Sequence, residues 1–376
     1  MIFSVDYKPQ AGGIAEHAHK VAQGLTRAGA SVVVLAPRTR GSREFDRGQD
    51  IPTFRVPRLP ILDLLLYFAA GCYLVRKHRI GVIYVATSSP CAPICAAMRL
   101  VVSFKYTVTI HAHEVVYEGS DLRYRIKKLV KPLQIAAIRS AHRVFAVSEF
   151  TRRMLVAAGV PASKISTIFN GIDPDDFEGE APVREVVERL GLGGKRVILT
   201  VARLDIHKGQ DMVMRALPAI IARVPEAVYV VVGEGKMRSR LLGLATELGV
   251  ERHVVLTGGI PRVDVIALMK VCDVFVMASR LERGSVEGFG IVFLEAGILG
   301  KPVVGGRSGG IPDAVEDGST GFLVDPESPD EIAQVVARIL EDRNLAARLG
   351  AAGRARTRAM FTWDEVVGRI VAGLNV

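Results

Sequence analysis

Short apolar runs alternate with amphipathic stretches along most of the chain. In the first half the runs are rich in β-branched residues and cover 30–37, 81–87, 105–112 and 142–148. Stretches with helical periodicity separate them, and the one at 15–30 closes at Gly29 in the manner of a helix C-cap. Continuous apolar strands that alternate with helices predict a parallel sheet covered on both faces.

The same alternation restarts in the second half of the chain. Its apolar runs cover 196–202, 227–235, 253–258, 273–279 and 301–306. Two such series predict an α/β protein with two doubly wound, Rossmann-like domains. Ligands of such domains bind beyond the carboxyl ends of the strands, so two domains facing each other would form an interdomain cleft.

The stretch 169–183 is rich in Gly, Pro and Asp and lies between the two series, which predicts a domain boundary there. We therefore expect an N-terminal domain over 1–172 and a C-terminal domain over 173–360. The tail at 361–376 predicts one last helix that packs back on the N-terminal domain. Thr362 and Glu365 have the spacing of a capping box at its start.

Composition sets the class of protein. With 376 residues, 49% hydrophobic and 23% charged, the chain fits a soluble globular protein of two domains. No secretory signal is apparent at the start, and the longest apolar stretch, 64–75, is too short to span a bilayer as a helix. The few, irregularly spaced cysteines predict reduced thiols in the core, as in a cytoplasmic enzyme, and no zinc site; they are Cys72, Cys91, Cys95 and Cys272.

Charge is distributed unevenly. Residues 1–172 carry 24 Lys and Arg against 10 Asp and Glu, whereas the remainder carries 25 against 29. A basic half indicates an anionic partner, and the absence of nucleic-acid recognition motifs leaves an anionic membrane surface or acceptor. The segment 121–133 interleaves basic and apolar residues and is the candidate membrane or acceptor contact, although a merely solvated basic helix has the same pattern. Its basic residues include Arg123, Arg125, Lys127 and Lys128.

Two carboxylates flank an uncharged run at 285–296. Glu287 and Glu295 are separated by Gly, aromatic and aliphatic residues only. Such a pair is consistent with a plain helix start. It is equally suited to accept hydrogen bonds from the hydroxyl groups of a sugar or ribose.

Groups that bind anions follow several predicted strands. Arg203 and Lys208 come just after the run at 196–202, and both side chains suit phosphate oxygens. Gly12 and Gly13 precede a predicted helix, whose N-terminal N–H groups attract anions, and Gly290 precedes another. The run "VVVGEGKMRSR" begins like a dinucleotide fingerprint but lacks its third small residue, which disfavours a nicotinamide or flavin dehydrogenase.

The order of these motifs resembles the retaining glycosyltransferases of family 4, which have the GT-B architecture. The matching pieces are "GGIAEHAHKVAQGLTRAGASVVVLAP", "TIHAHE", "FAVSEFTRRMLVAAGVPASKISTIFNGID", "VARLDIHKG", "VVGEG", the two glutamates and "SGGIPDAVEDGSTGFLVDP". They cover nearly the whole chain. One departure is Asp313, where the family more often carries glutamate.

The resemblance implies a role for each position. Arg203 and Lys208 would clamp the diphosphate of a nucleotide-sugar donor, and His111 would lie beside the transferred sugar, with His113 structural. The remaining donor contacts would come from the glycines near the N-terminus, from both glutamates, and from the backbone around the residues between the glutamates. These are Gly12, Gly13, Glu287, Phe289, Gly290, Ile291 and Glu295, with Glu295 on the ribose and Glu287 on the sugar.

We therefore expect a retaining hexosyltransferase that uses GDP-mannose or a UDP-sugar and needs neither a metal nor a cofactor. The stretch at 280–296 is similar to that of mannosyltransferases that act on phosphoinositides, which implies a lipid-linked or glycan acceptor. The enzyme would then be cytoplasmic, or peripheral on the inner face of the cell membrane, in the biosynthesis of envelope polysaccharide or glycolipid. Two alternatives are a nucleotide-sugar epimerase of the same fold and a non-catalytic subunit that binds a sugar nucleotide.

Overall fold

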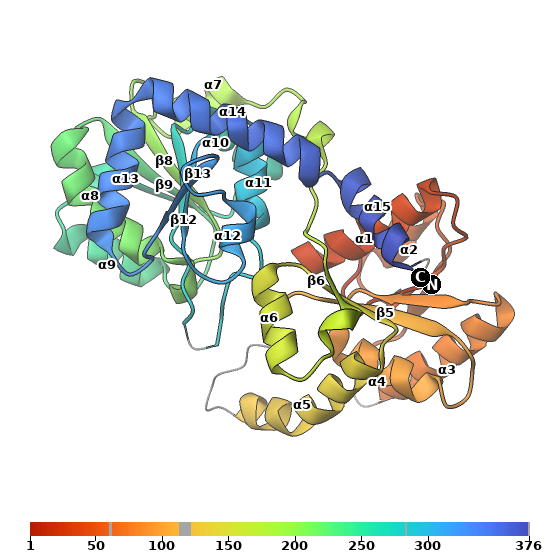
Figure 1. Ribbon diagram of the computed structural model, residues 1–376. Coiled ribbons are helices and arrows are strands. Elements are labelled where there is room, and N and C mark those ends of the chain that lie inside the picture. The colour runs from red at the N-terminus through yellow and green to blue at the C-terminus, as the bar shows by residue number, and fades with distance from the viewer. Residues whose placement is uncertain (60–61, 113–121, 283, 375–376) are drawn as a thin grey trace. The chain divides into compact units, whose positions relative to one another are not determined.

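The computed structural model describes residues 1–59, 62–112, 122–282 and 284–374, with the side chains of 122–129 excepted. The chain forms two compact units. Unit 1 contains Met1–Gly171 together with Trp363–Val376, and unit 2 contains Ile172–Thr362. Each unit is built on its own parallel sheet (Figure 1).

The sheet of unit 1 has seven parallel strands in the order β3-β2-β1-β4-β5-β6-β7. The short first strand is central, because Ile2 pairs with Val34 on one side and Tyr84 on the other. The strands are β1 (Ile2–Phe3), β2 (Val34–Pro37), β3 (Thr53–Val56), β4 (Val82–Val85), β5 (Lys105–Ile110), β6 (Arg143–Ala146) and β7 (Ile165–Thr167).

Helices cover both faces of this sheet (Figure 1). Successive strand residues point to opposite faces, so Ile2 faces α1 and α15 while Phe3 faces α3, α4 and α5. The helices are α1 (Gly13–Arg27), α2 (Ser42–Arg47), α3 (Leu62–Lys77), α4 (Ser88–Met98), α5 (Leu122–Ser140), α6 (Glu149–Ala157) and α15 (Trp363–Leu374), with a 3₁₀ turn η1 (Ala162–Lys164).

The C-terminal helix α15 belongs to unit 1 although it follows unit 2 in the chain. It packs against α1 so closely that a Cβ on Gly24 would lie 2.4 Å from Cγ2 of Val367. At its start Trp363 is buried, and a Cβ on Gly171 would meet its ring at 2.9 Å. Small residues thus let the returning helix approach the N-terminal helix and the end of the first strand series.

The sheet of unit 2 has six parallel strands in the order β10-β9-β8-β11-β12-β13. As in unit 1, the first strand of the series lies in the interior of the sheet, and the chain winds outward from it in both directions. The strands are β8 (Arg196–Val201), β9 (Ala227–Val232), β10 (Val254–Gly258), β11 (Val274–Met277), β12 (Val303–Gly306) and β13 (Gly321–Val324).

Helices also cover both faces of the second sheet. Apolar residues of α8, α9 and α13 form one core with the strands, and α10 packs on α7 and α11 on α14. The helices are α7 (Val183–Arg189), α8 (Gln210–Arg223), α9 (Arg238–Glu247), α10 (Arg262–Val271), α11 (Ile291–Ile298), α12 (Ile311–Ala314), α13 (Pro329–Glu341) and α14 (Arg343–Met360). Three 3₁₀ turns, η2 (Pro174–Phe177), η3 (Ile206–Lys208) and η4 (Glu251–His253), complete the unit.

The predicted fold class is confirmed, since both units are doubly wound α/β layers. All nine predicted strands are present, and α1 ends before Gly29, whose φ of 84° is the left-handed conformation expected of a C-cap glycine. The four cysteines are buried free thiols, as predicted. Among the described residues, no helix combines the length and the apolar character needed to cross a membrane.

Candidate functional site

The strand order of unit 2 places two loops at a topological switch point. β8 and β11 are neighbours, and the chain leaves them toward opposite edges of the sheet. A crevice forms at the carboxyl ends of such a strand pair, and ligands of doubly wound sheets bind there. Arg203 and Lys208 lie on the loop 202–209 after β8, and Glu287 and Gly290 lie on the loop 278–290 after β11.

Lys208 and Glu287 meet at this edge. The Lys208 Nζ donates to Glu287 Oε2 at 2.5 Å, and the two side chains are only 15% and 18% exposed. The turn η3 ends at Lys208, and Gly209 follows with a φ of 75°. A Cβ at Gly209 would lie 1.9 Å from the Ala278 carbonyl oxygen, so the two loops pack backbone against backbone.

Arg203 belongs to the same loop, with an exposed side chain. Its backbone carbonyl accepts a hydrogen bond from Nε2 of Gln210 at 2.9 Å, which fixes the loop to the start of α8. An exposed guanidinium and a mostly covered ammonium on one strand-end loop provide two positive charges for an anionic ligand.

The residues after Glu287 form the start of α11. Gly290 is the residue before this helix and has a φ of 92°, and Ile291 is the first helical residue. The Phe289 ring is buried against Phe361, with ring centroids 5.7 Å apart. Phe289 therefore anchors the loop through its side chain, and the donor contact predicted there would have to come from its backbone.

The loop 307–310, which follows the neighbouring strand β12, packs on the Glu287 loop. The backbone N–H of Gly310 donates to the Glu287 carbonyl at 2.9 Å, and a Cβ on Gly309 would lie 2.3 Å from that same oxygen. This close approach explains why the "SGGIP" motif has a glycine at position 309, where φ is 58°. Asp313 lies in the short helix α12, where its backbone carbonyl accepts from Arg356.

Glu295 is paired with a cation that sequence reasoning missed. Arg262, at the start of α10, donates from both terminal nitrogens to the two Glu295 oxygens, at 3.2 and 2.9 Å. The Glu295 side chain is 14% exposed, and the Arg262 guanidinium also lies over the ring of Phe177, 5.2 Å from its centroid. Arg262 follows a Gly-Gly-Ile-Pro turn, and nothing in that local pattern indicates a carboxylate partner 33 residues later in the chain.

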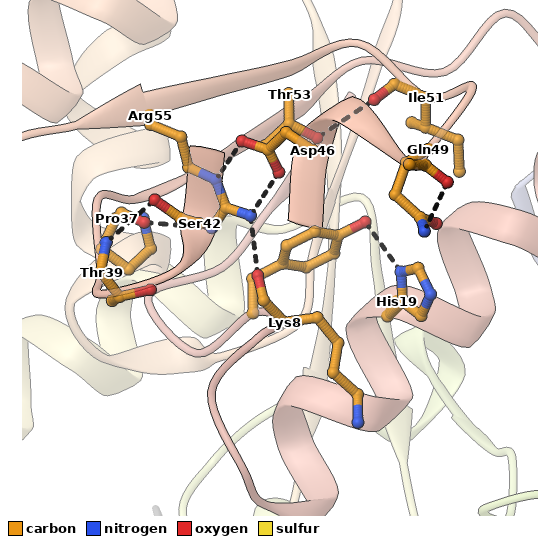
Figure 2. Close-up of polar contacts among 12 residues, drawn as sticks. Lys8, His19, Pro37, Thr39, Ser42, Asp46, Gln49, Ile51, Thr53 and Arg55 are labelled. Carbon is orange, nitrogen blue, oxygen red and sulfur yellow. Dashed lines mark hydrogen bonds and ion pairs between the residues drawn. The ribbon is translucent and has the colours of Figure 1, made fainter. Parts of the chain in front are cut away.

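In unit 1 the loop 4–12 leads from β1 to the predicted Gly12–Gly13 contact. Arg55 clamps this loop from β3: its guanidinium donates to both oxygens of Asp46 at 2.7 and 3.0 Å and to the Lys8 carbonyl at 2.7 Å (Figure 2). Gly12 precedes α1 with a φ of 138°, a conformation available to glycine. The loop therefore reaches the helix N-terminus in a fixed conformation.

His111 follows β5 in unit 1 and contacts a group of buried, hydrogen-bonded polar side chains. Its Nε2 lies 3.1 Å from the Ala86 carbonyl, and its ring meets that of His17 edge-on at 5.0 Å. His17 in turn bonds Tyr84 at 2.8 Å and Asn170 at 3.1 Å. Burial, reinforced by His111, lowers the pKa of His17 to about 3, so this imidazole is neutral.

Two of the sequence predictions concern residues that the structure leaves undescribed. His113 lies outside the described residues, as do the side chains of Arg123, Arg125, Lys127 and Lys128, although the backbone of 122–140 is helical in α5. Within the described ranges, no group of three or more His, Cys, Asp or Glu side chains is arranged to hold a metal ion.

Two doubly wound parallel sheets in one chain match the GT-B architecture that the sequence predicts. Solved structures agree on the fold: Anabaena HepE in complex with UDP superposes with a TM-score of 0.81 at 22% identity, over 100% of this chain and 99% of that one. Sucrose-phosphate synthase from Thermosynechococcus elongatus gives a TM-score of 0.76 at 23% identity, over 99% and 96%.

The chain belongs to glycosyltransferase family 4. The family model "Glycosyltransferase Family 4" matches residues 11–176, and "Glycosyl transferases group 1" matches 184–356. A GDP-mannose-dependent alpha-(1-6)-phosphatidylinositol monomannoside mannosyltransferase of Mycolicibacterium smegmatis is 34% identical over 100% of this chain and 98% of its own length. Its counterpart in Mycobacterium tuberculosis is 32% identical over 98% and 96%.

Proposed function

We propose that the protein transfers a hexose, with mannose from GDP-mannose favoured, to a lipid-linked acceptor with retention of anomeric configuration and without a metal ion. The Lys208–Glu287 pair at the switch point of unit 2 carries this proposal. The Lys208 ammonium lies 2.5 Å from the Glu287 carboxylate, and in the proposal the ammonium binds the leaving diphosphate and the carboxylate binds the sugar hydroxyls. The relatives named above, whose names give GDP-mannose and a phosphatidylinositol mannoside, support the choice of donor and acceptor class.

In the proposed reaction, the bond between the anomeric carbon and the diphosphate oxygen breaks, and a bond from that carbon to the acceptor hydroxyl oxygen forms. The acceptor proton passes to a phosphate oxygen of the leaving diphosphate on the same face of the sugar. Negative charge builds on the diphosphate while the sugar becomes oxocarbenium-like. Lys208 and Arg203 would stabilise that charge, and fixed charges of this kind contribute most when they need no reorganisation.

Calorimetric titration with GDP, UDP and ADP, each without metal and then with magnesium, tests the donor site. We expect GDP to bind selectively and magnesium to leave its affinity unchanged. Incubation of GDP-mannose with vesicles that contain phosphatidylinositol mannoside then tests transfer, and NMR of the product reports the anomeric configuration. A folded protein that binds none of the three nucleotides contradicts the proposal, and conversion of the nucleotide sugar without acceptor identifies an epimerase instead.

The outer face of α3 supports a lipid-linked acceptor. Leu62, Leu65 and Tyr73 recur at helical spacing and are 54%, 65% and 52% exposed. The turn after α4 adjoins this helix, because Arg76 donates to the Val101 carbonyl, and it exposes 88% of Leu100. Residues 51–113 carry seven Lys and Arg against one acidic residue. Exposed leucines among basic residues suit the surface of an anionic bilayer.

Co-sedimentation with vesicles tests this contact. We expect Leu65→Ser to weaken binding to vesicles rich in anionic lipid. The matched control is Leu242→Ser in unit 2, which removes a leucine that is 49% exposed and lies outside this face. Equal binding of both variants and the unsubstituted protein would contradict a role for α3.

A further inference from the structure

A buried ion pair that the proposed chemistry does not use joins the loop after β11 to the start of α8, beside the switch point of unit 2. Arg280, on the loop after β11, donates from its two terminal nitrogens to the two oxygens of Asp211 at 3.1 and 3.0 Å. Both side chains are 9% exposed. Asp211 is in the first turn of α8, immediately after the loop that carries Lys208.

Arg280 also contacts the Lys208 loop through its backbone. Its N–H donates to the His207 carbonyl at 2.9 Å, one residue before Lys208. On the other side, its Nε lies 3.7 Å from Oε2 of Glu282. Glu282 and Ser285 exchange two backbone hydrogen bonds, at 3.0 and 2.9 Å, which close the turn that leads to Glu287.

A buried ion pair is weak evidence for stability, because desolvation of the two charges offsets their attraction. The pair does, however, fix an orientation, because the planar guanidinium binds the carboxylate through two parallel hydrogen bonds. Burial by itself lowers the pKa of Arg280, but Asp211, Glu282 and Glu327 raise it overall, so this side chain stays charged. The Arg280 side chain thus ties the loop after β11 to the start of α8, in addition to the backbone contacts that the two loops make with each other.

We propose that Arg280 is a positioning residue that fixes the loops 202–209 and 278–290 in the register in which Lys208 meets Glu287. The effect of this positioning on catalysis rests on the function proposed above. Arg280 acts through the loops and touches neither Lys208 nor Glu287 in any contact described above. Loss of its grip would let the loops move independently, and a displacement of about 1 Å in a reacting group can cost about 100-fold in rate.

The decisive variant is Arg280→Met with Asp211→Leu. It removes both charges together, so no uncompensated charge stays buried, and replacement of a buried pair by apolar residues is often neutral for stability. The matched control is Arg196→Met. Arg196 pairs with Asp273 at 2.6 Å, with side chains 18% and 23% exposed, at the start of β8 and so at the opposite end of the same sheet.

Three readouts separate positioning from stability: the melting temperature, amide hydrogen exchange of both loops, and kcat and KM for GDP-mannose. For the double variant we expect a near-native melting temperature, exchange faster by about tenfold in both loops, and kcat/KM lower by about 100-fold. The control should lower the melting temperature and leave loop exchange and kcat/KM near native. Arg280→Lys keeps the charge but loses the two parallel bonds, so its loop exchange and its kcat/KM should lie between those of the native protein and those of the double variant.

Unchanged exchange in both loops of a folded double variant would overturn the proposal, and so would a near-native kcat/KM. If the double variant does not fold, Arg280→Lys decides by the same two criteria. Lys208→Ala, measured in parallel, keeps the two proposals distinguishable. Near-native turnover of Lys208→Ala would remove the diphosphate clamp, whereas faster loop exchange in the Arg280 variants would still establish the positioning role.

Discussion

Lys208→Ala is the substitution that tests the candidate site most directly. The ammonium is 2.5 Å from Glu287 and mostly covered, so it is held in place before any ligand arrives. Removal of one preorganised group that stabilises transition-state charge typically costs about 3 kcal/mol. Since 1.4 kcal/mol is about tenfold in rate, we expect kcat/KM for the donor to fall by roughly 150-fold.

The same substitution leaves Glu287 without its ammonium partner. A mostly buried charged group that loses its partner costs about 1–3 kcal/mol of stability. For a unit of this size that corresponds to a drop of several degrees in melting temperature, at about 2–4 °C per kcal/mol. The variant should therefore remain folded at 25 °C, and calorimetric unfolding checks that it does.

Single-turnover release of GDP from GDP-mannose, with acceptor vesicles in excess, isolates the chemical step. Lys208→Met serves as the control for packing, because it keeps the aliphatic stem and loses only the charge. Both variants should lose the same activity. Near-native turnover by either one would refute the assignment of Lys208 to the diphosphate.

Three further outcomes follow from the structure. If Glu295 binds the ribose as proposed, Glu295→Gln should weaken nucleotide binding, measured by calorimetry, by about tenfold while kcat changes less, because a ribose contact is made equally in ground and transition states. Gly209→Ala should destabilise unit 2 by more than about 1 kcal/mol, checked by thermal unfolding, since its φ is 75° and the added Cβ would lie 1.9 Å from the Ala278 carbonyl oxygen. Burial lowers the pKa of His17 from 6.5 to about 3, so the unfolded chain binds the proton more tightly than the folded chain. As pH drops below 6.5, His17 should therefore lower the free energy of unfolding by about 1.4 kcal/mol per pH unit. His17→Asn should remove this contribution from the pH dependence of stability measured by denaturant titration.

The strands that the sequence could predict are those that lie inside apolar runs of the chain. β8 and β9 are six residues each and read directly from the chain. β1 has only two residues, and β3 exposes Phe54 at the sheet edge, so neither gives a continuous apolar run. β7 reads Ile-Ser-Thr and β13 opens at Gly321, so the chain gives no long apolar run at either strand.

The candidate site likewise contains residues that the sequence could predict and residues that it could not. Residues in a local motif, such as Lys208 before a left-handed glycine, could be placed at a strand end from sequence alone. Partners that meet only in the folded unit could not: Arg262 and Glu295 are 33 positions apart, and Arg280 and Asp211 are 69 apart. Hydrophobic periodicity reports which face of an element is buried, and it carries no information on which charge lies opposite which.

The pairing of both glutamates with cations changes how ligand binding at this site should be understood. Glu287 accepts from Lys208 and Glu295 accepts from Arg262, so neither carboxylate awaits a ligand as an isolated charge. A diphosphate that approaches Lys208 must share the Lys208 ammonium with Glu287. Hydroxyl groups that approach Glu295 must likewise share the Glu295 carboxylate with Arg262. Binding is then an exchange of partners, and its free energy is the difference between two sets of contacts.

Glu287→Gln should therefore tighten the binding of free GDP, because Lys208 loses a competing anion, while it slows hexose transfer. Calorimetry and single-turnover rates on that one variant would show the two effects with opposite sign, and weaker binding of GDP would contradict the exchange.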